Sequence, residues 1–76
     1  MRQQQESVLV FDTPSGMGGS FTVSIVKELG DNWVTVRVWY GRATANGWES
    51  WNEWDGYTFA TTADKLINPR PMKLFK

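Results

Sequence analysis

The chain contains neither cysteine nor histidine, and each absence removes a class of chemistry. Without cysteine the protein has no disulfide framework and no thiolate metal site. Without histidine it lacks the commonest general base and the commonest metal ligand. We therefore expect a protein that is not an enzyme and that binds no metal ion or cofactor.

Long apolar runs and a net charge are also lacking. No run approaches the roughly 20 residues of a membrane-spanning helix, and no charged leader precedes an apolar segment. The 8 Lys and Arg residues balance the 8 Asp and Glu residues, so the formal net charge is zero. A dedicated nucleic-acid binder normally carries a clear basic excess. These observations favour a cytoplasmic protein without a membrane partner.

The length of 76 residues is enough for one small domain with a thin core. The first segment, residues 1–6, is polar, and we expect it to be flexible. Residues 7–76 then form a single domain. Nothing in this part of the chain repeats or suggests a domain boundary.

Alternating apolar residues are the clearest structural signal that is present. Residues 7–11, 21–25 and 33–40 have the β-branched, alternating pattern of strands. In the third of these, one face carries only residues suited to a buried, pleated surface. We expect that core face to hold Val34, Val36, Val38 and Tyr40.

Two dipeptides, Asn46-Gly47 and Asp55-Gly56, are typical of type I′ hairpin turns. Together they predict a three-strand meander between residues 39 and 59. In that register Trp39 lies opposite Trp54, and Trp54 lies opposite Tyr57. The meander would therefore align aromatic rings across three strands on one face.

Two alternatives to this meander remain open. A bulge at Gly41 would exchange the faces of the residues before and after it. Trp48, Trp51 and Trp54 are also spaced by three, which suits a helical or 3₁₀ turn instead of a strand.

The C-terminal part is expected to contain a short helical turn and a final strand. Thr62 can cap one helical turn. The segment 68–71 contains two prolines and cannot continue a helix, so it should be extended. Residues 72–75 then supply a short edge strand.

This order of elements resembles an SH3-like small β-barrel: a strand, a long loop, a three-strand meander, a short helical turn and a closing strand. The resemblance covers residues 7–75 and lies in the layout. It implies an all-β fold of about five antiparallel strands. SH3-like barrels typically bind peptides, modified side chains or nucleic acids, so it also implies a non-catalytic binding module.

The aromatic residues indicate where such a module would bind. The chain has 5 Trp, 2 Tyr and 4 Phe, more rings than one thin core can hold. Exposed rings mark a surface for a protein partner or for self-association, and acidic residues between them would steer basic partners. The candidate partner-binding residues are Trp33, Trp39, Trp48, Trp54 and Tyr57, with Glu49, Glu53 and Asp55 as an acidic rim.

Two other functions stay open. A nucleic-acid-binding barrel would stack bases on the rings and use Arg37, Arg42, Lys65, Arg70 and Lys73. An oligomer could also build one enzymatic site shared between copies. The small, neutral, disulfide-free chain would suit an accessory protein of a phage or other mobile element.

Overall fold

A computed structural model of the protein describes residues 7–16 and 18–76. The segment 1–6, which we expected to be flexible, lies outside the described residues. The described part is all-β, with a five-strand antiparallel sheet and one 3₁₀ turn before the last strand, so the predicted fold class is confirmed. The elements are β1 (Ser7–Pro14), β2 (Ser20–Gly30), β3 (Trp33–Val38), β4 (Gly41–Thr44), β5 (Gly47–Ser50), β6 (Thr58–Thr62), η1 (Ala63–Lys65) and β7 (Ile67–Lys73).

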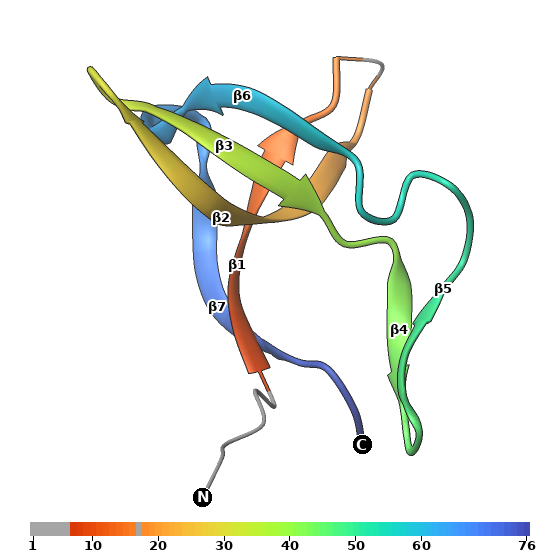
Figure 1. Ribbon diagram of the computed structural model, residues 1–76. Coiled ribbons are helices and arrows are strands. Elements are labelled where there is room, and N and C mark those ends of the chain that lie inside the picture. Colours follow the sequence, from red (N-terminus) through yellow and green to blue (C-terminus); the bar gives the residue numbers. More distant parts are fainter. Residues whose placement is uncertain (1–6, 17) are drawn as a thin grey trace, which may run out of the picture.

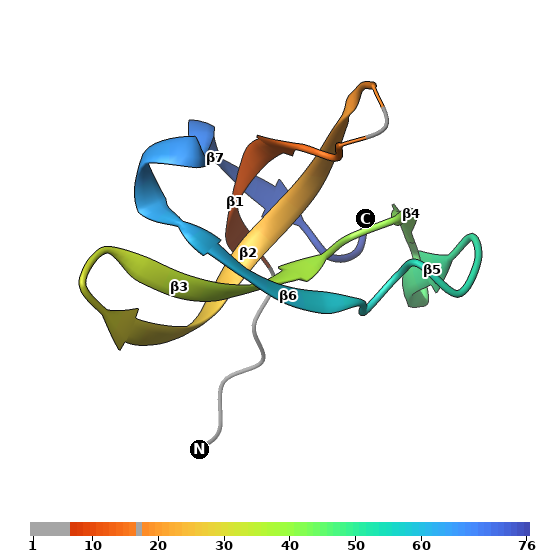
Figure 2. The ribbon, with the colours of Figure 1, turned by 90° about the horizontal axis from the view of Figure 1, so that it is seen from above.

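Five strands form a curled sheet in the order β6-β3-β2-β1-β7, and β4 and β5 form a separate hairpin (Figure 1). The sheet bends strongly when seen from above (Figure 2). It is nevertheless not closed into a barrel, because β6 and β7 remain its two edges. The closed barrel expected from the SH3-like layout is therefore replaced by an open sheet.

Valines form the core of the sheet. Val34, Val36 and Val38 of β3 are buried, as predicted, and Val23 of β2 packs with them. Phe11, Phe21, Phe59 and Leu66 cover this cluster from the other strands and from the segment after η1. Tyr40 does not join the core as predicted. It follows the end of β3 and is 42% exposed.

The β2–β3 hairpin closes through a two-residue turn, and its register shifts between Ile25 and Lys27 and again between Glu28 and Gly30. Gly30 pairs with Trp33, so Asp31 and Asn32 are the two turn residues. Their φ angles of 53° and 70° are both positive, as a type I′ turn requires. These two residues therefore reverse the chain between β2 and β3.

The predicted meander is wrong beyond β5. The strand that follows, β6, pairs with β3 and not with β5. Residues 52–56 form turns between these strands, so Trp54 does not lie in a ladder opposite Trp39 or Tyr57. The alternative of a helical or 3₁₀ turn through Trp48, Trp51 and Trp54 does not form either, because Trp48 lies in β5 and residues 52–56 form turns that are not helical.

The β4–β5 hairpin forms, but its register differs from the predicted one. Thr44 pairs with Gly47, so the turn residues are Ala45 and Asn46. The Thr44 hydroxyl donates to the Gly47 carbonyl at 2.8 Å and accepts the Asn46 N–H at 3.1 Å. Gly41 pairs regularly with Ser50 and is not a bulge.

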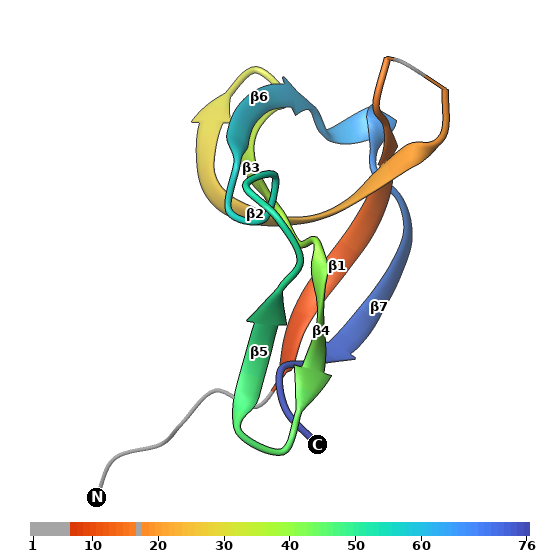
Figure 3. The same ribbon diagram turned by 90° about the vertical axis from the view of Figure 1, so that its right-hand side faces the viewer.

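The last strand is longer than expected and begins at Ile67. It pairs with β1, and it includes the proline-containing segment 68–71. Beyond it, Phe75 forms a parallel bridge with Thr44, and the Lys76 N–H donates to the Thr44 carbonyl at 2.9 Å. Figure 3 shows the resulting arrangement, with the β4–β5 hairpin below β3 and β6 and the C-terminus next to it.

Candidate functional site

A cleft of about 630 Å³ opens between the five-strand sheet and the β4–β5 hairpin. We call it the aromatic cleft. Its walls carry aromatic side chains, small polar groups and backbone, and the described residues that line it include no Asp, Glu, Lys or Arg. The lining residues are Ser15, Gly18, Gly19, Ser20, Phe21, Thr22, Val38, Trp39, Tyr40, Gly41, Trp48, Trp51, Asn52, Trp54 and Met72.

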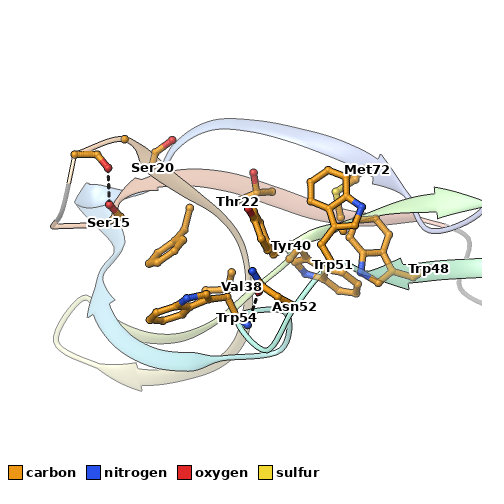
Figure 4. A pocket seen from close by; sticks show the side chains of 15 residues that line it. Ser15, Ser20, Thr22, Val38, Tyr40, Trp48, Trp51, Asn52, Trp54 and Met72 are labelled. Atoms are coloured by element: carbon orange, nitrogen blue, oxygen red, sulfur yellow. Dashed lines mark hydrogen bonds between the residues drawn. The ribbon is translucent and has the colours of Figure 1, made fainter.

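Half-exposed rings stand at the mouth of this cleft. Trp51 is 58% exposed, Tyr40 is 42% exposed and Trp54 is 39% exposed. Tyr40 and Trp51 meet edge to face with their ring centroids 5.3 Å apart. In Figure 4 the rings of Tyr40, Trp48 and Trp51 lie at one end of the cleft, and Trp54 lies toward the other. The cleft therefore offers several aromatic surfaces to one extended ligand.

A smaller hollow of about 250 Å³ adjoins the aromatic cleft. Phe21 and Trp54 line both, so these two rings separate them. Their centroids are 5.7 Å apart, and Trp54 also meets Tyr57 at 5.2 Å. Tyr57 in turn lies 5.9 Å from Phe59. A continuous row of rings thus leads from the cleft into the smaller hollow.

Local hydrogen bonds fix the segment that presents Trp54. The Asn52 side-chain oxygen accepts the Trp54 N–H at 2.8 Å, and the Asn52 carbonyl accepts the Asp55 N–H at 3.1 Å. The Gly56 N–H then donates to the Val38 carbonyl at 2.8 Å. Gly56 has a φ of +96°, which glycine adopts without strain. The ring of Trp54 is therefore carried by an ordered turn tied to β3.

Asp55 holds this turn to the neighbouring strands. Its carboxylate accepts hydrogen bonds from the Tyr40 N–H at 2.9 Å, from Trp48 Nε1 at 3.2 Å and from the Ser50 hydroxyl. Arg37 Nη2 lies 3.7 Å away. Burial acts to raise the pKa of Asp55, but these hydrogen bonds and the Arg37 charge outweigh it and hold the pKa below its usual range.

Trp39 and Trp48 form the inner wall of the cleft. Their rings meet edge to face at 5.1 Å, and the Arg37 guanidinium carbon lies 3.5 Å from the Trp39 ring centroid. Trp39 Nε1 donates to the buried Ser24 hydroxyl at 2.9 Å. Both indole N–H groups are thus occupied within the protein, and the two tryptophans hold the hairpin on the sheet.

The structure brings most of the predicted aromatic anchors together. Trp39, Trp48 and Trp54 line the aromatic cleft, and Tyr57 lines the smaller hollow. Trp33 lies apart: it begins β3, it is 47% exposed and it lines neither hollow. The predicted single strip is therefore a cleft with an adjoining hollow, and Trp33 belongs to another surface.

The predicted acidic rim divides into three environments. Glu53 is exposed in the turn. Glu49 pairs with Arg42 at 2.6 Å on the surface of the hairpin. The side chain of Asp55 is only 3% exposed, so it does not lie on a rim and instead holds the turn in place.

The basic residues proposed for nucleic-acid binding lie on different elements, and three of them pair with carboxylates. Arg37 faces Asp55, and Arg42 faces Glu49. Arg70 Nη2 lies 3.0 Å from Asp12, whose pKa is lowered by hydrogen bonds from Asn68 and Arg70 and by the Arg70 charge. The remaining two, Lys65 and Lys73, are in η1 and at the end of β7.

Three aromatic residues of the cleft were not among the predicted anchors: Phe21, Tyr40 and Trp51. The signal for Trp51 was its spacing of three from Trp48 and from Trp54, which indicated a turn. Tyr40 is the last residue of the alternating run 33–40, so its pattern predicted burial. Phe21 lies in a strand whose alternation says nothing about a cleft beside it.

Among residues 7–16 and 18–76, no helix is long and apolar enough to cross a membrane. No group of three Asp or Glu residues in the same ranges is placed to hold a metal ion. No known family model matches the chain, and neither does any curated protein or solved structure.

Proposed function

We propose that this protein is a non-catalytic binding module that takes an extended segment of a partner protein into the aromatic cleft. The observation that carries the proposal is the row of half-exposed rings on an ordered turn, from Trp51 through Trp54 to Tyr57. Exposed aromatic rings are large apolar surfaces that lose water favourably when a partner covers them.

The chemistry of the lining favours a protein segment over a nucleic acid. A nucleic-acid site needs Lys or Arg beside the rings, and neither is found among the described residues that line the aromatic cleft. Arg37, which lies close to these rings, stacks on Trp39 and faces Asp55. Backbone and small polar groups along the same walls suit the amides of an extended peptide, and the rings suit its apolar side chains.

The SH3-like layout is part of this proposal. The first and last of the five strands are neighbours, and η1 precedes the last strand, as in the expected order of elements. The β4–β5 hairpin is then an insertion between β3 and β6 that builds one wall of the cleft. The open sheet is the main departure from a closed barrel.

Peptide selection tests this proposal even though the partner is not identified. A random peptide library displayed on phage is selected against the purified protein, and the dissociation constants of the chosen peptides are measured. We expect Trp51→Ala to weaken binding by about tenfold or more, which is about 1.4 kcal/mol. The fold should survive, because Trp51 is the most exposed of these rings. Trp54→Ala should weaken the same peptides, with a loss above about 1 kcal/mol.

Trp33→Ala is the matched control, since it removes an equally large exposed ring outside both hollows. Its affinity for the peptides should equal that of the unmodified protein. Binding should also change little with salt, whereas nucleic-acid binding would weaken steeply. Failure to select any peptide, or equal losses in the Trp33 and Trp51 variants, would reject the proposal.

A further inference from the structure

The two edges of the five-strand sheet differ in composition. One edge strand is β7, which contains Pro69, Arg70, Pro71 and Lys73. Proline has no N–H to donate to a further strand, and edge charges oppose pairing. The other edge strand is β6, which has the sequence Thr-Phe-Ala-Thr-Thr. This edge carries neither proline nor charge.

Hydrogen bonding at the start of β6 shows which of its residues face outward. The Val38 N–H donates to the Tyr57 carbonyl at 2.8 Å, so this position is a hydrogen-bonded pair. Hydrogen-bonded and non-hydrogen-bonded pairs alternate along an antiparallel ladder. Phe59 and Thr61 are therefore hydrogen-bonded positions, and their backbone groups pair with those of Val36 and Val34 in β3.

The residues between them direct their backbone groups the other way. Thr58, Ala60 and Thr62 occupy the non-hydrogen-bonded positions of the β3–β6 ladder, so their N–H and C=O groups point to the free edge. Within the described residues only β3 pairs with β6, and Thr58 and Ala60 are exposed. An unprotected edge of this kind is a template for another strand.

We propose that β6 is a dimerisation edge that pairs antiparallel with β6 of a second copy of this chain. Placing Ala60 on the two-fold axis sets Ala60 opposite its own copy and Thr58 opposite Thr62. All three are outward-facing residues, so each pair exchanges N–H···O=C bonds. Directly opposed threonines also stabilise a sheet, and small alanines let the backbones approach at the centre.

Charge and symmetry select a second copy as the occupant. In a two-fold antiparallel pair the central residue faces its own copy and the other residues face residues of the same strand, so charges of one sign on β6 would repel one another; β6 carries no charge. The chain has a formal net charge of zero, which removes overall repulsion between copies. The prolines of β7 block the opposite edge, so pairing stops at a closed dimer and does not continue into a fibre.

An exposed ring beside β6 would enlarge the contact. Trp33 pairs with Thr62 in the β3–β6 ladder and is 47% exposed. In the two-fold arrangement Thr62 faces Thr58 of the second copy, so Trp33 lies next to the contact between the two β6 strands. Trp33 lines no part of the aromatic cleft, and in the dimer it would extend this contact.

A charge-swap experiment tests the dimer. Sedimentation velocity over a concentration series should show a monomer–dimer equilibrium for the unmodified protein. Ala60→Lys and Ala60→Glu should each be monomeric, with a dimer dissociation constant raised at least tenfold, because like charges meet on the axis. Mixing the two variants should restore a dimer, since Lys then faces Glu. The matched control is Ala45→Lys, a charge on the β4–β5 turn, which should dimerise like the unmodified protein.

Amide hydrogen exchange provides the second readout. The amides of Thr58 and Ala60 should exchange quickly at low concentration and slowly in the dimer, while those of Phe59 and Thr61 stay protected throughout. A monomer at all concentrations would overturn the proposal, as would a dimer in which Thr58 and Ala60 remain unprotected. Protection of these amides only on adding a selected peptide would assign the edge to another protein and also overturn it. Peptide affinity in the aromatic cleft should be equal in the Ala60 variants, so this test is independent of the proposed function.

Discussion

At the scale of single residues, Gly41 lies where the β4–β5 hairpin leaves no room for a side chain. A Cβ at this position would collide with the Glu49 carbonyl oxygen and would lie 2.9 Å from Trp48 Nε1. We expect Gly41→Ala to lower the free energy of unfolding by about 2 kcal/mol, because the hairpin must shift to relieve this overlap. Urea denaturation followed by tryptophan fluorescence measures the loss.

A second glycine provides the control for this substitution. Gly18 has a φ of +85°, and a Cβ added there would meet nothing within 4 Å, so Gly18→Ala costs about 1 kcal/mol through the backbone alone. The Gly41 variant should lose more, and its peptide binding should fall because Trp48 lines the aromatic cleft. Equal losses at the two glycines would contradict the steric explanation.

Asp55 makes stability depend on pH. Its pKa is lower in the folded protein than the usual value of 3.8. The unfolded chain therefore binds the proton first as the pH falls, so the stabilisation is complete above the unfolded pKa and is lost as the pH decreases through the folded pKa. At neutral pH, Asp55→Asn should lower the free energy of unfolding by about 2 kcal/mol, because the charged acceptor of several hydrogen bonds is lost.

The pH profile distinguishes this role from a general effect of the substitution. The unfolding free energies of the unmodified protein and of Asp55→Asn should begin to converge as the pH falls below about 4, where the unfolded chain takes up the proton. They should meet only below the lowered pKa of Asp55 in the folded protein. Glu53→Gln, an exposed neighbour in the same turn, should change stability by no more than about 0.5 kcal/mol. A constant difference between the proteins from neutral to strongly acidic pH would show that the Asp55 charge does not stabilise the turn.

At the scale of elements, the β2–β3 hairpin depends on two residues with positive φ. Asn32 has a φ of 70°, which asparagine tolerates and glycine prefers. Asn32→Gly should retain or slightly raise the free energy of unfolding, and Asn32→Ala should lower it by about 1 kcal/mol. Thermal unfolding of both variants measures the difference. If alanine and glycine have the same effect, the left-handed conformation of this residue contributes nothing to hairpin stability.

Strands were easier to predict than the pairing of strands. Alternation is a local property, so residues 21–25 and the valines of β3 were placed correctly from sequence alone. The Asn46-Gly47 dipeptide predicted a hairpin in the right place but in the wrong register. The Thr44 side chain binds both ends of the actual turn and shifts it by one residue. The turn preference of the Asn46-Gly47 dipeptide does not take account of a contact made by Thr44, which lies outside the dipeptide.

The predicted strand pairing after β5 was wrong because it depends on contacts that a local sequence pattern does not include. Asp55-Gly56 is a strong hairpin signal, yet the Asp55 carboxylate accepts hydrogen bonds from Trp48 and Ser50 of the preceding strand and from Tyr40, which is 15 residues away. Those bonds turn the chain back to β3 before a hairpin with β5 can form. The number of tryptophans predicted an interaction surface, and that surface stays a prediction. The cleft that four of the tryptophans line depends on this return of the chain to β3.

At the scale of the whole molecule, the structure consists of two unequal sheets. The five-strand sheet has its own valine core, and the β4–β5 hairpin is held to it by Trp39, Trp48 and Asp55. The tail contributes one more connection through Thr44 and Phe75. The aromatic cleft lies between the two sheets, so its shape depends on how firmly the hairpin is attached.

This division predicts two levels of unfolding. Trp48→Ala removes the ring that meets Trp39 and the indole N–H that binds Asp55, so the hairpin should open while the valine core stays folded. Native-state hydrogen exchange should then show lost protection at residues 41–50 and little change in β2 and β3. Val36→Ala acts on a fully buried core residue and should cost about 2 kcal/mol. That loss should lower protection in both sheets, because the hairpin has no support without the core. If Trp48→Ala also lowers protection throughout β2 and β3, the two sheets unfold as one cooperative unit, and the cleft cannot open independently of the core.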